Sequence, residues 1–225
     1  MRIGKLLGLA AACGGFVLAA RGADEALNAP VPLVQWTESA SPGSAAKLKN
    51  AADWALATGF SLQAADFYAE LLALPNADRA SLTLARATAL LEGGRADDAR
   101  KTLAALPEPH SAGWHLRAGL AALQLRDYNT MRTELAALRE PELPPADYPW
   151  YWFLQGAYVD IFTPQEISRA NNFYVRAENA APNELALARF RLAGQEVRLW
   201  RGQAPTPDEL KTMRDNFENN QGKAI

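Results

Sequence analysis

The sequence predicts an all-α fold built from repeated helix pairs, and two observations support this prediction. Ala and Leu, the strongest helix formers, make up a third of the 225 residues, whereas only six Val and four Ile are present. Small residues also recur along most of the chain at intervals of 32 to 39 residues. A repeat of this length is typical of stacked helix pairs.

The first 22 residues are expected to be a signal peptide. Arg2 and Lys5 precede an apolar stretch from Leu6 to Ala20, and small residues follow it. This stretch is shorter than the roughly 20 apolar residues that a membrane span needs. We therefore expect an exported protein with no membrane span in its mature chain.

The single cysteine allows a second interpretation of this leader. Cys13 follows Leu9-Ala10-Ala11-Ala12, which resembles the cleavage box of bacterial lipoproteins. Ala10 stands where such boxes usually have Leu, and apolar sequence continues past the cysteine. Ordinary cleavage would remove Cys13, whereas lipoprotein processing would leave it as a lipid anchor. The expected location is the bacterial periplasm or cell envelope in both cases.

Residues 23–45 are expected to form a flexible linker, and residues 46–221 a domain of helical repeats. The linker prediction rests on segments rich in Pro, Ser and Gly, with little periodicity. In the repeats, the expected first helices carry small residues at equivalent positions: Ala52, Ala87, Gly119 and Gly156. The expected second helices carry a corresponding set: Ala64, Ala99, Met131 and Ala170. Small residues at these positions would let two helices approach to about 8–10 Å.

Two similar segments predict helix starts in the last two pairs. Residues 163–166 and 206–209 each consist of Thr, Pro, one polar residue and Glu. Thr at the N-cap, Pro at the first helical position and Glu at the third form a capping box. The second segment predicts a fifth helix pair over residues 183–221.

The repeats resemble the tetratricopeptide repeat. Residues 152–156 (Trp-Phe-Leu-Gln-Gly) are similar to the first half of its 34-residue motif. Residues 170–174 (Ala-Asn-Asn-Phe-Tyr), with Ala177 and Pro182, match the second half more closely. The resemblance implies a right-handed superhelical solenoid of about five antiparallel hairpins with a concave binding surface.

Nothing in the sequence indicates catalytic or metal-binding machinery. The net charge of −2 argues against nucleic-acid binding, which needs a clustered basic surface. No phosphate-binding loop, zinc-protease motif or serine-hydrolase motif is present. His110 and His115 are interpreted as ordinary residues. We therefore predict a protein that is not an enzyme and that holds no metal or cofactor.

The most prominent feature is a run of aromatic residues between positions 148 and 158. The resemblance to tetratricopeptide repeats implies that Trp150, Phe153 and Ala157 line the concave surface, beside Leu116 and Leu120 of the preceding repeat. One interpretation is that these side chains only fill the core. The other is that they form a groove for a peptide, because aromatic and aliphatic side chains anchor peptide ligands.

The function expected from these features is that of a non-catalytic scaffold or adaptor in the bacterial cell envelope. A protein or peptide partner would bind to the concave surface. The alternatives are a carbohydrate-binding accessory that stacks sugars on the aromatic run, and the recognition part of a larger envelope enzyme.

Overall fold

The computed structural model describes residues 42–200 and 207–220, and every regular element within these ranges is a helix. The prediction of an all-α fold is thereby confirmed. The expected signal peptide, Cys13 and residues 23–41 of the expected linker lie outside the described residues. The first helix begins at Pro42, so the last four residues assigned to the linker are helical.

Ten α-helices follow one another along the described part of the chain: α1 (Pro42–Ala57), α2 (Ser61–Leu72), α3 (Arg79–Glu92), α4 (Ala96–Leu103), α5 (Ala112–Gln124), α6 (Tyr128–Ala137), α7 (Tyr148–Phe162), α8 (Ile167–Asn179), α9 (Glu184–Trp200) and α10 (Pro207–Asn220). Two short 3-10 helices lie between α6 and α7: η2 (Glu140–Glu142) and η3 (Pro145–Asp147). None of the described helices is long and apolar enough to cross a membrane.

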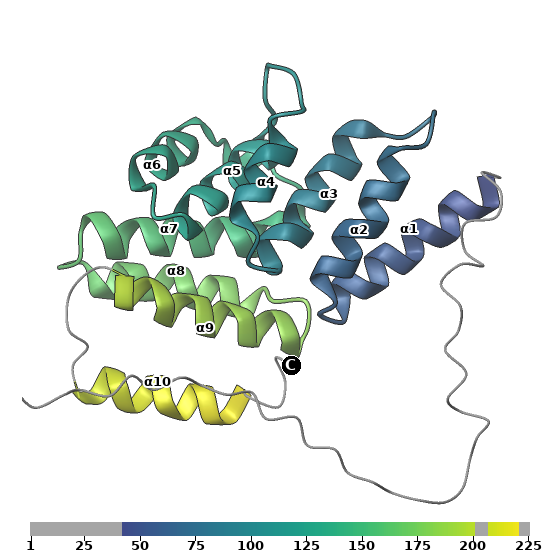
Figure 1. Ribbon diagram of the computed structural model, residues 1–225. Coiled ribbons are helices and arrows are strands. Elements are labelled where there is room, and N and C mark those ends of the chain that lie inside the picture. Colours follow the sequence, from purple (N-terminus) through teal and green to yellow (C-terminus); the bar gives the residue numbers. More distant parts are fainter. Residues whose placement is uncertain (1–41, 201–206, 221–225) are drawn as a thin grey trace, which may run out of the picture. The chain divides into compact units, whose positions relative to one another are not determined.

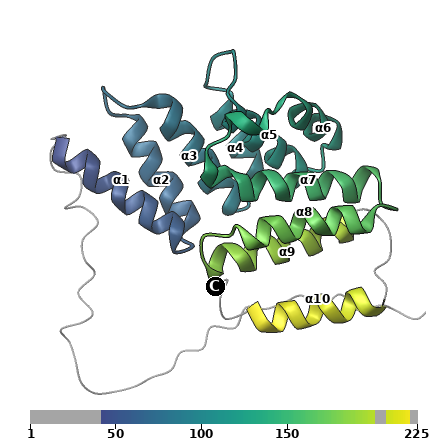
Figure 2. The same cartoon turned by 180° about the vertical axis from the view of Figure 1, so that it is seen from behind.

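Neighbouring helices pack together as pairs, beginning with α1 and α2 and ending with α9 and α10 (Figures 1 and 2). The second helix of each pair also contacts the first helix of the next pair. Contacts between α3 and α5, between α5 and α7, and between α7 and α9 connect the first helices directly. These first helices therefore pack in succession.

The turns inside the first three pairs have the same backbone structure. The middle residue of each turn has a positive φ, which is 96° at Gly59, 72° at Gly94 and 58° at Arg126. The next residue in each case donates its N–H to the carbonyl five residues earlier, at 2.8 Å. This hydrogen bond and the left-handed residue form a Schellman ending, which closes one helix and reverses the chain.

The small residues of the sequence repeat lie where helices approach most closely. Ala52, Ala87 and Gly119 are buried, as is Gly156. A Cβ on Gly119 would lie 2.8 Å from Cδ2 of Leu154, and one on Gly156 would lie 2.7 Å from the ring of Tyr174. The corresponding residues of the second helices are also buried: Ala64, Ala99, Met131 and Ala170.

The capping box predicted at residues 163–166 is wrong. Helix α8 begins at Ile167, and the Thr163 hydroxyl donates back to the carbonyl of Val159 at 3.1 Å. Thr163 therefore ends α7 instead of starting α8. In the fifth pair, α10 begins at Pro207 as expected, and the proposed capping residue Thr206 lies outside the described residues.

Candidate functional site

A pocket of about 370 Å³ lies between the first helices of the second to fifth pairs. Side chains of α3, α5, α7 and α9 form most of its wall, and η3 contributes one residue. Its apolar lining residues are Leu91, Leu116, Leu120, Leu123, Trp150, Phe153, Leu192, Ala193, Val197 and Trp200. Pockets of this size and composition are typical of ligand-binding sites.

Four of the five residues predicted to form a groove line this pocket: Leu116, Leu120, Trp150 and Phe153. Trp150 is half-buried, whereas Leu116, Leu120 and Phe153 are only 1, 6 and 3% exposed. Ala157 is completely buried and does not line the pocket. The four lining residues therefore belong to the packed interior and to the pocket wall at the same time.

Trp150 and Phe153 are held by an aromatic cluster that joins α7 to α8 and α9. The Trp150 ring lies edge-on to Phe190, with centroids 4.6 Å apart, and edge-on to Phe153 at 6.0 Å. Phe153 also contacts Tyr174 and Phe190, at 5.9 and 6.1 Å. These ring contacts fix one wall of the pocket, because each ring is held by several others.

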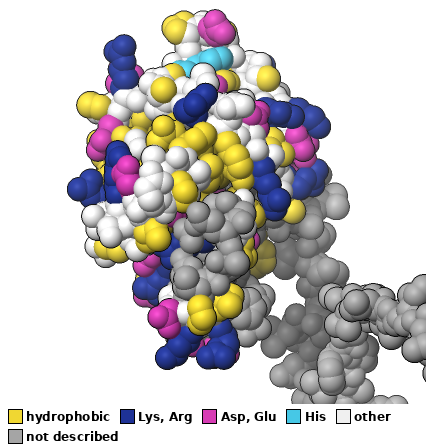
Figure 3. All heavy atoms as spheres, turned by 90° about the vertical axis from the view of Figure 1, so that its left-hand side faces the viewer, with side chains coloured by type: hydrophobic (Ala, Val, Ile, Leu, Met, Phe, Trp, Pro, Cys, Tyr) yellow, Lys and Arg dark blue, Asp and Glu magenta, His cyan; other side chains and the backbone are white. Residues whose placement is uncertain are grey.

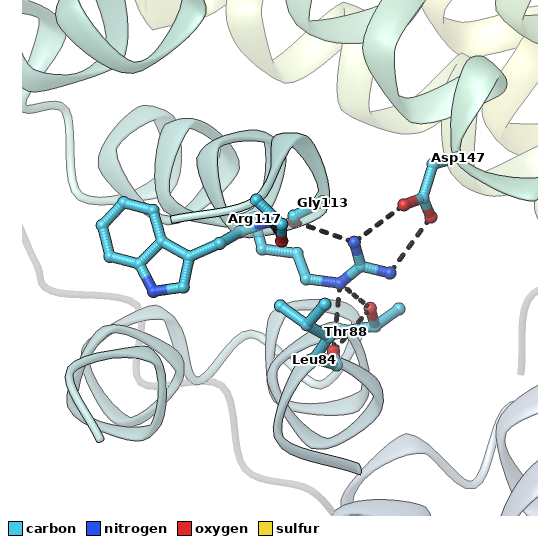
Figure 4. Close-up of polar contacts among 7 residues, drawn as sticks. Leu84, Thr88, Gly113, Arg117 and Asp147 are labelled. Carbon is cyan, nitrogen blue, oxygen red and sulfur yellow. Dashed lines mark hydrogen bonds and ion pairs between the residues drawn. The ribbon is translucent and has the colours of Figure 1, made fainter. Parts of the chain in front are cut away.

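Arg117 of α5 also lines the pocket, and all three nitrogens of its guanidinium group donate hydrogen bonds (Figure 4). Its two terminal nitrogens donate to the Asp147 carboxylate at 2.9 and 3.0 Å, and Nη1 also donates to the Gly113 carbonyl at 2.9 Å. Nε donates to Thr88 Oγ1 at 2.7 Å and to the Leu84 carbonyl at 3.0 Å. This network connects α3, α5 and η3 and neutralises the charge of Arg117.

A second ion pair, between Arg189 of α9 and Glu92 of α3, also lines the pocket. Arg189 additionally donates to Ser61 Oγ of α2, at 3.2 Å. Burial raises the pKa of the Glu92 carboxyl, and the opposing effect of Arg189 is smaller. The pair therefore adds two largely buried, mutually compensated charges to the lining.

Glu196 and Trp200 lie one turn apart on α9 and contribute to the same lining. Among the described residues, no side chain pairs with the Glu196 carboxylate. Surrounding protein removes water from this carboxyl and so raises its pKa. The guanidinium of Arg126 lies over the Trp200 ring, 5.3 Å from its centroid.

A second pocket of about 330 Å³ adjoins the first and shares Glu92, Trp150 and Arg189 with it. Asp53 and Tyr68 lie in its wall, and the Tyr68 hydroxyl donates to Asp53 Oδ1 at 2.7 Å. The shared side chains form the partition between the two spaces.

The histidines lie away from both pockets. His115 Nδ1 is 2.7 Å from Glu134 Oε2, a carboxylate partner that the sequence pattern did not predict. His110 stacks on Trp114, with ring centroids 3.7 Å apart. In the part of the chain that the structure describes, no group of three or more His, Cys, Asp or Glu side chains could hold a metal ion.

Apolar side chains also reach the surface away from the pockets. Trp54 and Phe60 are exposed at the turn between α1 and α2, and their rings stack at 6.3 Å. On the face of the molecule seen in Figure 3, hydrophobic side chains gather near the centre with charged side chains around them.

The polar side chains of the pocket were missed by the sequence-based prediction. Leu123 was also missed, although it continues the face of α5 that carries Leu116 and Leu120. The local sequence pattern does not indicate which charged residues pair with one another, such as Glu92 with Arg189.

Comparison with known proteins adds no relative, since no family model, no curated protein and no solved structure matches the chain. The function of the pocket is therefore inferred from its geometry.

Proposed function

We propose that the chain is a non-catalytic adaptor that binds an apolar segment of a partner protein in the pocket between α3, α5, α7 and α9. The observation that carries this proposal is the pocket itself, in which four successive first helices place apolar side chains around about 370 Å³. This volume lies within the range of about 300–1,000 Å³ that is usual for ligand pockets.

We also propose that the helix pairs form a tetratricopeptide-type repeat array. Packed neighbouring pairs, three equivalent turns and buried small residues at the repeat positions support a repeat protein of the tetratricopeptide type. In such proteins each helix pair covers the apolar face of the next, and the first helices line a common concave surface.

The ring geometry favours a protein segment over a carbohydrate. A sugar would need an open aromatic face, yet Trp150 and Phe153 are engaged with Phe190 and with each other. Tyr148 and Trp152 stack together, with centroids 5.6 Å apart. The aliphatic side chains of Leu116 and Leu120 complete a lining suited to apolar side chains.

An array of immobilised decapeptides tests the proposal. Each peptide carries a four-residue combination of Leu, Val, Phe and Trp between Gly-Ser flanks, and the purified chain is the labelled probe. Ala193→Phe fills the pocket without removing a core contact, because Ala193 is a half-buried lining residue. The substitution should reduce binding to the selected peptides more than tenfold.

Ala136→Phe is the matched control, because Ala136 is exposed on α6 and lies in neither pocket. It should leave peptide binding unchanged. Absence of binding to every peptide, or equal binding by both variants, would refute the proposal.

The proposed location is the periplasm or cell envelope of a bacterium, on the basis of the charged and apolar pattern in residues 1–22. The test is the intact mass of the protein recovered from the envelope fraction. Loss of about the first 22 residues would indicate ordinary export, and a diacylglycerol-modified Cys13 would indicate a lipoprotein. An unprocessed mass in the cytoplasmic fraction would contradict both.

A further inference from the structure

The charges around the pocket between α3, α5, α7 and α9 do not balance. Five charged residues line it: Glu92, Arg117, Asp147, Arg189 and Glu196. Four of them form the two ion pairs, Arg117 with Asp147 and Arg189 with Glu92. Within the described residues, Glu196 is the lining charge that has no partner, so the described part of the lining carries one uncompensated negative charge.

Both arginines of the lining already pair with a carboxylate of the protein. Arg117 already uses its guanidinium nitrogens on Asp147, Thr88 and two backbone carbonyls. Arg189 donates to Glu92 and Ser61. A carboxylate that entered the pocket would therefore lose water without gaining a free cationic partner.

Glu196 is placed to meet a cation that arrives with an apolar side chain. It lies on α9 between Ala193 and Trp200, which both line the apolar part of the pocket. The Glu196 side chain is exposed on α9, and partial desolvation by the neighbouring protein raises the pKa of its carboxyl. An ion pair with an incoming cation at such a position is modest in strength and sensitive to salt. Arg126 is a nearby positive charge, but it lies over the Trp200 ring and does not line the pocket.

We infer that the segment bound in this pocket carries Lys or Arg beside its apolar side chain, and that Glu196 recognises this cation. The inference rests on the proposed function, because it specifies which segments the adaptor selects. It also predicts that acidic segments are rejected, since Glu196 would then face a like charge.

The test uses the apolar core selected most strongly by the peptide array. That core is synthesised as three soluble fluorescent peptides, flanked on both sides by Lys, by Gln or by Glu. Fluorescence anisotropy then measures the Kd of each. The Lys peptide should bind about fivefold more tightly than the Gln peptide, and the Glu peptide should bind most weakly. The advantage of the Lys peptide should shrink when salt is raised from about 0.05 to 0.5 M.

The variant Glu196→Gln assigns the preference to one residue. It should remove the difference in Kd between the Lys and Gln peptides. Glu70→Gln is the matched control, because Glu70 is exposed on α2 and outside the pocket. This control should keep the full preference for Lys.

The outcomes separate the two proposals. If no core binds, the proposed function fails and this inference fails with it. If a core binds but its Lys, Gln and Glu forms have Kd values within twofold of one another, only the inference is overturned. A Lys preference that survives in Glu196→Gln would overturn the role of Glu196.

Discussion

Arg189 of α9 donates a hydrogen bond from Nη1 to Glu92 Oε2 of α3, so an ion pair joins positions 97 residues apart. Both side chains are largely shielded from water. The same arginine reaches Ser61 at the start of α2. Helix α9 is thereby fastened to the first two helix pairs, in addition to its packing against α7 and α8.

Breaking this pair should destabilise the fold. Arg189→Gln should lower the free energy of unfolding by about 2 kcal/mol at about pH 7, because it leaves the Glu92 carboxylate without its partner. Glu92→Gln should cost less, because burial already disfavours the charged form of this carboxyl. The double variant should lose clearly less than the sum. Urea denaturation of the four proteins measures the coupling. The exposed pair Arg100 and Asp97 is the control and should show coupling below about 0.5 kcal/mol. Equal coupling energies for the Arg189–Glu92 pair and the Arg100–Asp97 pair would contradict the structural role of Arg189.

The raised pKa of Glu92 predicts a pH dependence of stability. In the unfolded chain this carboxyl titrates near 4.5, whereas burial raises its pKa in the folded protein. The folded state therefore holds the proton more tightly, and its contribution to stability is complete below pH 4.5 and declines as pH rises through the folded pKa. Glu92→Gln should give a flatter dependence of unfolding free energy on pH above 4.5. The free energy of unfolding is measured by urea denaturation at several pH values. If it changes with pH equally in the parent protein and in Glu92→Gln, burial does not raise the pKa of Glu92.

Two helical glycines should respond to alanine in opposite directions. Gly156→Ala should cost about 2 kcal/mol, because the new Cβ would meet the Tyr174 ring at 2.7 Å. That ring is held by its hydroxyl, which donates to Asp160 at 3.0 Å. Gly194→Ala should stabilise by up to about 1 kcal/mol, since the nearest atom is 3.8 Å away and Ala favours a helix. Thermal unfolding followed by circular dichroism tests both. Equal effects would mean that the α7–α8 crossing does not require glycine.

The helix content and the pairing of neighbours were predictable because they depend on local signals. Small residues at equivalent positions, such as Ala87 and Gly119, mark where two helices touch, and they are buried as expected. Gly59 and Gly94 likewise mark two of the turns through their positive φ. The resemblance to tetratricopeptide repeats, whose register implies one shared surface, groups Leu116, Leu120, Trp150 and Phe153, and all four line the pocket.

The polar part of the pocket was not predictable from the same signals. Arg117 meets Asp147 thirty positions along the chain, and Arg189 meets Glu92 across most of the fold. Such contacts depend on how the pairs pack, which a local pattern does not encode. The error at Thr163 has a related cause. A Thr hydroxyl can accept a bond from a following helix or donate to a preceding one, and here it bonds to the carbonyl of Val159.

Arg117 should not tolerate replacement by lysine. Its planar guanidinium binds both Asp147 oxygens while Nε reaches Thr88 and Leu84, and a single ammonium group cannot reproduce this arrangement. Arg117→Lys should lower the free energy of unfolding by about 2 kcal/mol even though the charge is kept. Arg132 is exposed on α6 with its guanidinium over the Phe162 ring, a contact that lysine can also make, so Arg132→Lys should change the free energy of unfolding by less than about 0.5 kcal/mol. If Arg117→Lys leaves the free energy of unfolding in urea unchanged, a positive charge alone is enough to stabilise the fold at this position.

Arg126 occupies the turn position that glycine holds in the first two pairs, and its φ of 58° is unfavourable for a residue with a Cβ. Arg126→Gly should relieve about 1 kcal/mol of backbone strain, while loss of the contact with Trp200 costs about 0.5 kcal/mol. Arg126→Ala keeps the strain and loses the same contact. The Gly variant should therefore be about 1 kcal/mol more stable than the Ala variant in urea denaturation. Equal stabilities would mean that the positive φ at position 126 causes no measurable backbone strain. The predicted difference would show that the backbone of Arg126 is strained at this turn, where its guanidinium lies over Trp200 of the pocket lining.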